Sequence, residues 1–215
     1  MDSGITVTGT GQAQAPADLL RIHLNIGRDA ADVSAAVEAV AEQTEAVTAA
    51  LSGQGVAAAD LRTSAVNVYP HYGESMQIAG YRASHSLTVS TADLTGFGRL
   101  LKVAIDAIGN DLGLDQLTFD IADKSPLVEQ ARQSAFTDAR QRAEHLAELS
   151  GRRLSRIESV VETRDYGPPV PMASPSGGRA SADIAVAPGQ QTVESSVTVR
   201  WAWDDSPSVR PTPAP

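Results

Sequence analysis

Two long strand patterns, separated by a very short turn, constrain the fold of this chain more than any other feature. Residues 61–72 (LRTSAVNVYPHY) and 77–91 (QIAGYRASHSLTVST) both have the composition of β-strands, and GES at 73–75 fits the turn between them. An arm of about 12 residues spans roughly 40 Å at about 3.3 Å per residue, which exceeds the usual strand length. We therefore expect a long β-hairpin arm.

The other hydrophobic patterns place this hairpin within a mixed series of strands and helices. Strand patterns occur at 5–10, 19–27, 116–123, 155–163 and 192–203, and helical patterns at 32–53, 93–108 and 125–150. The resulting order, ββαββαβαββ, predicts the α+β class, with helices packed on a largely antiparallel sheet. Asp32 is the expected N-cap of the first helix, and Gly53 the expected residue after its end. The inner stripe of the third helix consists of alanines, which lets another element approach closely.

The length of 215 residues allows one large domain or two small ones. We expect one domain over residues 1–203. Within it, residues 164–191 are rich in Pro, Gly, Ser and Ala, which is typical of a mobile loop. Residues 204–215 have the composition of a disordered tail.

Charge and cysteine content exclude several kinds of chemistry. The formal net charge is −9, which argues against binding to a nucleic acid and weakly against binding to anionic membranes. Because the chain has no cysteine, disulfides, cysteine–zinc sites and thiol catalysis are excluded.

The beginning of the chain bears on its location. MDSGITVTGTG enters a strand pattern at once, without the basic and apolar regions of a signal peptide. No apolar run approaches the ~20 residues of a membrane-spanning helix. We therefore expect a cytoplasmic protein; the alternative is a periplasmic or cell-envelope location, if a leader was removed.

Four stretches, taken in order, resemble the SIMPL-domain family. They are ITVTGTGQAQAPAD, TSAVNVYPHY, IAGYRASHSLTVSTADL and ARQSAFTDARQRAEHLAELSGRRLSRIESVVE. The resemblance covers roughly residues 4–203, with a small departure at Pro16-Ala17-Asp18, where the family usually has Pro-Asp. It implies an α+β domain that is homo-oligomeric in bacterial members, which are often periplasmic or envelope-associated and linked to oxidative stress. An animal relative is named for its association with a kinase in inflammatory signalling. The family has no established catalytic residues, so the resemblance assigns no site.

His85, in the middle of the second hairpin strand, is the first candidate for chemistry. It could be a metal ligand or general base, but we favour a hydrogen-bonded histidine on a partly buried face. The other histidines, His23, His71 and His145, show no metal-binding spacing. No hydrolase, zinc-protease or paired-carboxylate motif is present. We therefore expect no catalytic residue, no metal site, no cofactor-binding site and no cofactor.

Two further motifs have structural explanations that we prefer to functional ones. TGTGQA at 8–13 resembles a phosphate loop but lacks the G-K-[ST] ending and the following helix. Arginines around the end of the third helix indicate either an anion site or pairing with Glu144 and Glu148 near the helix dipole. They are Arg140, Arg142, Arg152, Arg153 and Arg156.

Tyr69, Tyr72 and Tyr81 lie near the turn end of the hairpin and are the expected oligomer contact. They could instead form cross-strand pairs, and both alternatives stay open. Gly80 would let a neighbouring group pack against its strand, or allow a bulge. Arms of this length are hard for the helices of one domain to cover, so bare apolar residues and an unpaired strand edge would favour self-association.

These observations predict a non-enzymatic, homo-oligomeric protein with a protective or scaffolding role related to stress. The alternative is a small-molecule or peptide-binding module that uses a cleft beneath the 164–191 loop. The expected partner is a second copy of the chain. We expect neither a nucleic-acid partner nor a membrane span.

Overall fold

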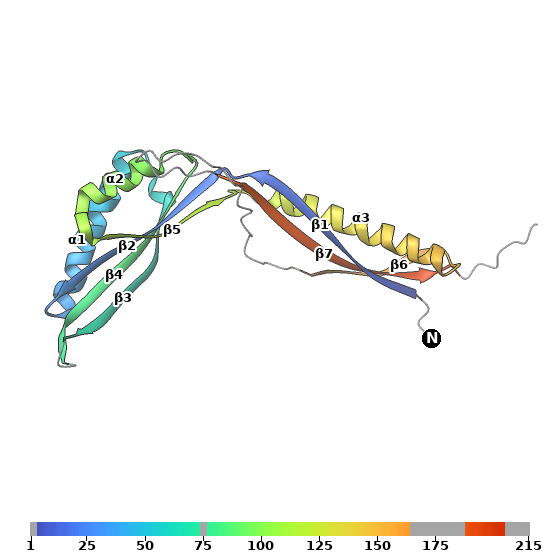
Figure 1. Cartoon of the computed structure of the whole chain (residues 1–215), viewed down its shortest axis with the longest axis horizontal. Helices are drawn as coiled ribbons and strands as arrows, with labels where there is room; N and C mark the ends of the chain where they lie inside the picture. Colours follow the sequence, from blue (N-terminus) through green and yellow to red (C-terminus); the bar gives the residue numbers. More distant parts are fainter. Residues whose placement is uncertain (1–3, 74–76, 164–187, 205–215) are drawn as a thin grey trace, which may run out of the picture. The chain divides into compact units, whose positions relative to one another are not determined.

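The structure is a computed structural model that describes residues 4–73, 77–163 and 188–204. These residues form three α-helices and seven strands in the order ββαββαβαββ, so the predicted order and the α+β class are confirmed (Figure 1). They fall into two compact units. Unit 1 contains residues 4–15, 123–163 and 190–204, and unit 2 contains residues 16–73, 77–122 and 188–189. The expectation of a single domain over residues 1–203 stays a prediction.

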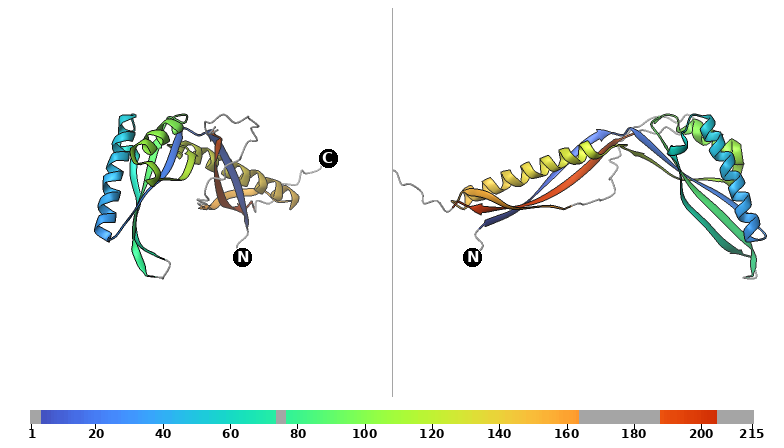
Figure 2. Two further views of the ribbon diagram at one scale, coloured as in Figure 1. Left: turned by 60° about the vertical axis from the view of Figure 1, so that its left-hand side comes forward. Right: turned by 180° about the vertical axis from the view of Figure 1, so that it is seen from behind.

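Unit 2 is a four-stranded antiparallel sheet with two helices on one face (Figure 2). Its strand order is β3-β4-β2-β5. Its elements are β2 (Leu19–Ala30), α1 (Val33–Gly53), β3 (Leu61–Tyr72), β4 (Ile78–Thr91), α2 (Phe97–Ile108) and β5 (Leu112–Asp120).

The core of unit 2 follows from the alternation in β2. Every second side chain of this strand points toward the helices and is almost fully buried: Leu20, Ile22, Leu24 and Ile26. The helices add buried side chains to the same cluster, among them Val47, Leu51, Phe97 and Leu100. Because burial of one such side chain stabilises by roughly 1.5–3 kcal/mol, this cluster holds the helices on the sheet.

Unit 1 is a three-stranded sheet with one long helix along it. Its elements are β1 (Gly4–Pro16), α3 (Ser125–Leu149), β6 (Leu154–Thr163) and β7 (Gln190–Trp203), and its strand order is β1-β7-β6. β6 and β7 pair antiparallel. β1 and β7 also run antiparallel, because Thr8 contacts Thr198 while Gln12, further along β1, contacts Glu194.

The alanine stripe of α3 brings the helix unusually close to β1. The buried stripe consists of Ala131, Ala135, Ala139, Ala143 and Ala147. Opposite it, a Cβ atom added to Gly9 would overlap the carbonyl of Ala135 and the backbone of Ala139. Gly11 stands in the same relation to Ala131 and Ala135. The TGTG stretch is therefore a close-packing strand, which explains its glycines without a phosphate.

Several boundaries differ from the predicted ones. The first helix includes Gly53, and the glycine with positive φ after it is Gly55 (φ 88°). The second helix begins at Phe97 rather than at residue 93, because Asp93 binds the backbone of Thr95 in a turn. The hairpin arm is embedded more deeply than expected, since β4 pairs with β2 from Tyr81 to the end of the strand.

None of the described helices is long and apolar enough to cross a membrane. Most of the predicted mobile loop, residues 164–187, and most of the predicted tail, residues 205–215, lie outside the described residues.

Candidate functional site

The outer end of the β3–β4 hairpin exposes three large side chains. Tyr69, Tyr72 and Ile78 are 62%, 56% and 53% exposed. The register places Tyr69 opposite Arg82 and Tyr72 opposite Ile78. Ala83 is buried against α1, so its neighbour Arg82 and the paired Tyr69 face away from the helices. We call Tyr69, Tyr72 and Ile78 the hairpin surface.

Tyr81 lies apart from the other two tyrosines. It pairs with Pro70, is partly buried, and packs against a small cluster that includes Val40 of α1 and Ala83. The structure thus leaves Tyr69 and Tyr72 exposed and packs Tyr81 toward α1. None of the three tyrosines is the register partner of another.

Strand β3 is an edge strand with features that oppose the addition of another strand. Among the described residues it pairs only with β4. Its register shifts between Thr63 and Ala65 and again between His71 and Tyr72, and Pro70 lies between these irregularities. Bulges and proline interrupt the regular row of backbone donors that an added strand needs. The edge of β3 is therefore better suited to contacts through side chains than to strand addition, which an unpaired strand edge would otherwise favour.

Gly80 accommodates a neighbouring side chain, as one of the two sequence-based interpretations predicts. A Cβ atom at this position would lie 3.3 Å from two atoms of the His71 ring and 2.7 Å from the carbonyl oxygen of Ala30. The absence of a side chain lets the ring lie across the strand. Gly80 also sits beside the register shift at Tyr72.

His85 is a fully hydrogen-bonded histidine that links α1 to β3. Its Nδ1 lies 2.9 Å from Thr44 Oγ1, and its Nε2 lies 2.9 Å from Thr63 Oγ1. The Thr44 hydroxyl donates to the Val40 carbonyl, so it must accept from His85 Nδ1–H. Nε2 then accepts from Thr63. Partial burial lowers the pKa of His85, which agrees with this neutral form. The structural interpretation of His85 is confirmed.

The other histidines do not converge on His85. His23 lies on the opposite face of the sheet, where its Nδ1 is 3.1 Å from Thr88 Oγ1. His71 lies on β3 and His145 on α3. Across the described residues, no three His, Asp or Glu side chains are grouped closely enough to hold a metal ion.

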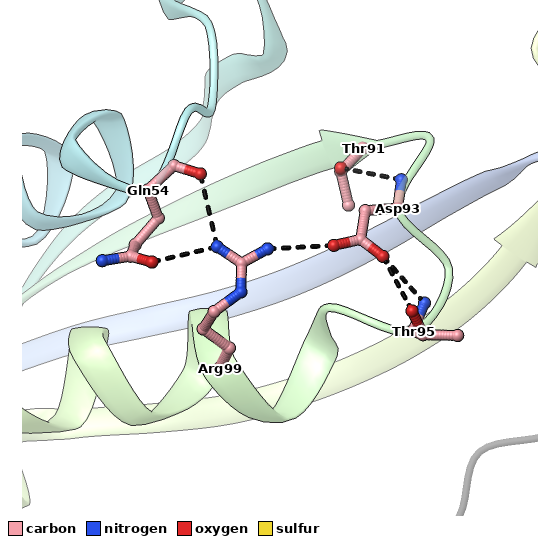
Figure 3. Close-up of polar contacts among 5 residues, drawn as sticks. All are labelled: Gln54, Thr91, Asp93, Thr95 and Arg99. Carbon is pink, nitrogen blue, oxygen red and sulfur yellow. Dashed lines mark hydrogen bonds and ion pairs between the residues drawn. The ribbon is translucent and has the colours of Figure 1, made fainter.

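A polar cluster that the sequence analysis missed joins α2 to the end of α1 (Figure 3). Asp93 accepts from the backbone and hydroxyl of Thr95 and from Arg99, at 3.2, 3.0 and 2.9 Å. These bonds, led by the Thr95 hydroxyl, lower the pKa of Asp93. Arg99 also donates to the backbone and side-chain oxygens of Gln54, just beyond α1. The sequence Asp-x-Thr before a helix is the signal that could have revealed it.

The arginines near the end of α3 are largely engaged within the chain. Arg140 pairs with Glu144 at 2.8 Å, and Arg142 pairs with Asp138 at 3.0 Å. Arg152 lies over the ring of Trp203. This arrangement agrees with the preferred interpretation as intramolecular pairing, although the partner of Arg142 is Asp138 rather than Glu148.

The ion pair of Asp138 and Arg142 on α3 has a second role that no local sequence pattern indicates. Asp138 accepts from the backbone N–H of Thr10, and Arg142 donates to the carbonyl of Thr8, at 2.9 and 3.3 Å. Both backbone groups belong to β1, an edge strand of its sheet. These side chains occupy backbone groups of an edge strand that an added strand would otherwise use.

Comparison with models of known protein families identifies the family of the chain. The family model described as SIMPL, a protein of unknown function (DUF541), matches residues 5–201.

The chain belongs to the SIMPL family.

The match covers residues of both units, including the hairpin, the three helices and strands of both sheets. Two relatives carry the name 26 kDa periplasmic immunogenic protein, one from Brucella melitensis biotype 1 and one from Brucella abortus strain S19. Each is 30% identical over 176 residues, which is 78% of this chain and 69% of the relative.

Proposed function

We propose that this SIMPL protein is a non-catalytic periplasmic protein that assembles with copies of itself through the hairpin surface and has a protective or scaffolding role. The observation that carries the proposal is the exposure of Tyr69, Tyr72 and Ile78 at the outer end of the hairpin. Aromatic side chains are enriched in protein interfaces, because they bury a large apolar area and lose little conformational freedom.

The periplasmic location is supported by the name of the Brucella relatives. Nothing in the comparisons supports the cytoplasmic location expected from the first residues of the chain. The non-catalytic role is supported by His85, whose two ring nitrogens are already bonded to threonine hydroxyls. A general base needs a free nitrogen within reach of its substrate.

A second copy fits the hairpin surface better than a charged ligand does. The exposed side chains of this surface are aromatic or aliphatic, and Arg82, the register partner of Tyr69, is paired with Asp29 at 2.8 Å. In a two-fold contact the same apolar patch would cover itself, which removes both copies of the patch from water.

The test is the mass of the protein in solution. Light scattering on the wild type at micromolar concentration is expected to give an oligomer, and Tyr69→Asp/Tyr72→Asp is expected to give a lower mass. Both side chains are exposed, so circular dichroism should show an unchanged fold. Ile105→Asp/Leu149→Asp is the matched control, because it charges two other exposed apolar positions (45% and 72%).

Each outcome addresses a different part of the proposal. A monomeric wild type would refute self-assembly. An unchanged oligomer in the folded tyrosine variant, or an equal loss of mass in the control, would refute the assigned interface.

A further inference from the structure

One face of the unit 2 sheet carries a continuous array of hydrogen-bonding side chains. The two helices of the unit cover the opposite face (Figure 2). Side chains that alternate with the buried residues of β2 and β4 point away from these helices, and the register brings six such residues of three adjacent strands together. All six are partly exposed. We call them the polar strip: His23 and Asn25 of β2, Asn67 of β3, and Ser84, Ser86 and Thr88 of β4.

Hydrogen bonds across the strands fix several side chains of the polar strip. Thr88 Oγ1 lies 3.1 Å from His23 Nδ1. On the next row, Asn25 Nδ2 donates to Ser86 Oγ at 3.4 Å. Because such groups are already ordered, they lose less conformational freedom when a ligand binds.

The same bonds leave both donors and acceptors of the strip unused. Asn67 Oδ1 accepts from the Tyr69 hydroxyl at 3.3 Å, so the Asn67 Nδ2 group remains available as a donor. Asn25 donates through Nδ2 and keeps Oδ1 as an acceptor. The Ser84 hydroxyl, which lies between these two amides in the register, has no side-chain partner among the described residues. A matching ligand must therefore offer donors and acceptors side by side.

The charges beside the polar strip give no strong preference for an ionic ligand. At one end, Arg82 pairs with Asp29 at 2.8 Å, and its guanidinium lies over Gly27, where an added Cβ atom would be 2.9 Å from Arg82 Nη2. At the other end, Arg62 is the register partner of Thr88. The six residues of the strip include no Asp, Glu, Lys or Arg. A nucleic acid needs a larger positive surface than this.

A neutral, polyhydroxylated molecule matches these groups. Each hydroxyl of a sugar ring is both a donor and an acceptor, as are the hydroxyls and carboxamides of the strip. An apolar partner would leave the amides and hydroxyls without hydrogen bonds, and an extended polypeptide satisfies its backbone at the edge of a sheet rather than on its face. We propose that the polar strip binds a neutral saccharide chain. This activity lies beyond self-assembly, and the strip shares no residue with the hairpin surface.

The extent of the strip favours several linked sugars over a single ring. From Ser84 to Thr88 the strand rises about 13 Å, and the three strands together add about 10 Å across the sheet. A single ring contacts only part of this area. A linear saccharide uses more than one row of side chains and gains further hydrogen bonds.

The first experiment measures saccharide binding to the full-length chain by saturation-transfer difference NMR. The probes are three neutral tetrasaccharides, maltotetraose, cellotetraose and chitotetraose, and their monosaccharides. At least one tetrasaccharide is expected to bind saturably, about tenfold or more tightly than its monosaccharide. The proposal is overturned if no tetrasaccharide binds, and the extended site is overturned if ring and chain bind equally well.

The second experiment places the site on the sheet. Asn25→Leu/Asn67→Leu removes two carboxamides while nearly keeping the side-chain shape, and should weaken binding by about tenfold or more. Thr8→Val/Thr198→Val is the matched control. These threonines adjoin the buried Val7 and Val199 and therefore lie on the face of the unit 1 sheet that points away from α3. Circular dichroism checks that both variants fold. Wild-type binding by the asparagine variant, or an equal loss in both variants, would refute the assigned face.

Two further measurements test other occupants of the strip. A hyaluronan tetrasaccharide, which carries carboxylates, is the acidic probe. If it binds more tightly than every neutral tetrasaccharide, the neutral ligand class is wrong. Light scattering on the asparagine variant covers a second copy of the chain: a lower oligomer mass than that of the wild type and the threonine control would place a protein contact on this face and overturn the saccharide site.

Discussion

Unit 1 packs one helix, and unit 2 packs two helices, on one face of an antiparallel sheet. The side chains at the contact between helix and sheet are small in unit 1 and large in unit 2. The core of unit 2 is built from Leu, Ile, Val and Phe side chains. The contact between α3 and β1 in unit 1 is built from alanines and from Gly9 and Gly11. Larger side chains of unit 1, Val197, Val199 and Trp201, come from the neighbouring strand β7.

This difference shows how side-chain volume sets the separation between a helix and a strand. In unit 2, branched side chains fill the layer, and small adjustments of their rotamers can absorb a change in volume. At Gly9 and Gly11 no side chain lies between the two backbones, so only the helix or the strand itself can move. The energetic consequence is that unit 1 tolerates less change at its closest contact than unit 2 does.

The strongest test of this comparison adds one methyl group at each of the two glycines. Gly9→Ala/Gly11→Ala is expected to destabilise unit 1 by about 3 kcal/mol or more, because the new Cβ atoms overlap the α3 backbone. The two tryptophans of the chain, Trp201 and Trp203, both lie on β7, so intrinsic fluorescence reports unfolding of unit 1. The fluorescence transition in urea should move to a much lower concentration.

The control is the same substitution in a strand of unit 2. At Gly113 of β5, an added Cβ would meet its nearest neighbours at 3.6 Å, which is an ordinary contact. Gly113→Ala should therefore change the free energy of unfolding by less than about 1 kcal/mol. Comparable losses in the two variants would show that the close approach in unit 1 does not limit its stability.

A smaller effect is expected from the polar cluster of unit 2. Arg99→Ala removes the bonds to Asp93 and Gln54 that fasten α2 to the end of α1. Because these groups are about half exposed, the expected loss is about 1 kcal/mol. Lys102→Ala, which breaks a more exposed pair with Asp106 on the same helix, should cost about 0.3 kcal/mol. Urea unfolding followed by circular dichroism measures both, and equal losses would assign no special role to Arg99.

Local patterns predicted much of this fold because they depend on neighbours in the sequence. The order of strands and helices follows from hydrophobic alternation, and Asp32 caps α1 by accepting from Ala35 as its position predicts. The alanine stripe of α3 correctly indicated a close neighbour. The family was also predicted from ordered stretches of sequence, and the match to residues 5–201 confirms it.

The errors arose where the outcome depends on distant parts of the chain. Val33 and Val37 of α1 and Leu146 of α3 fit the hydrophobic periodicity of their helices, yet they are 44%, 42% and 45% exposed. Periodicity defines the face of a helix but not how far the opposing sheet extends beneath it. Likewise, no local signal shows that the seven strands divide into two sheets, or that Asp138 reaches the backbone of Thr10.

The candidate site was predicted in part. Position in the hairpin suggested that Tyr69, Tyr72 and Tyr81 form one contact. The register places Tyr81 on the opposite face from Tyr69, and a shift next to Tyr72 interrupts the alternation there. A one-residue irregularity reverses which face a side chain occupies, and such irregularities have no reliable signature in a single sequence.

The smallest expected effect concerns His85, which couples α1 to β3 within unit 2 and has no counterpart in unit 1 among the described residues. Burial lowers its pKa in the folded state below the ordinary value of about 6.5. Between these two values the unfolded chain binds more protons than the folded one, so the free energy of unfolding rises with pH in this range. The contribution of His85 is therefore fully present above about pH 6.5 and declines as the pH falls toward the folded-state pKa.

His85→Gln keeps a polar side chain but cannot titrate. The stability difference between wild type and His85→Gln, from urea unfolding followed by circular dichroism, should be larger at neutral pH than at mildly acidic pH. A difference that stays constant, or grows in acid, would show that the neutral ring between Thr44 and Thr63 is not what stabilises this link.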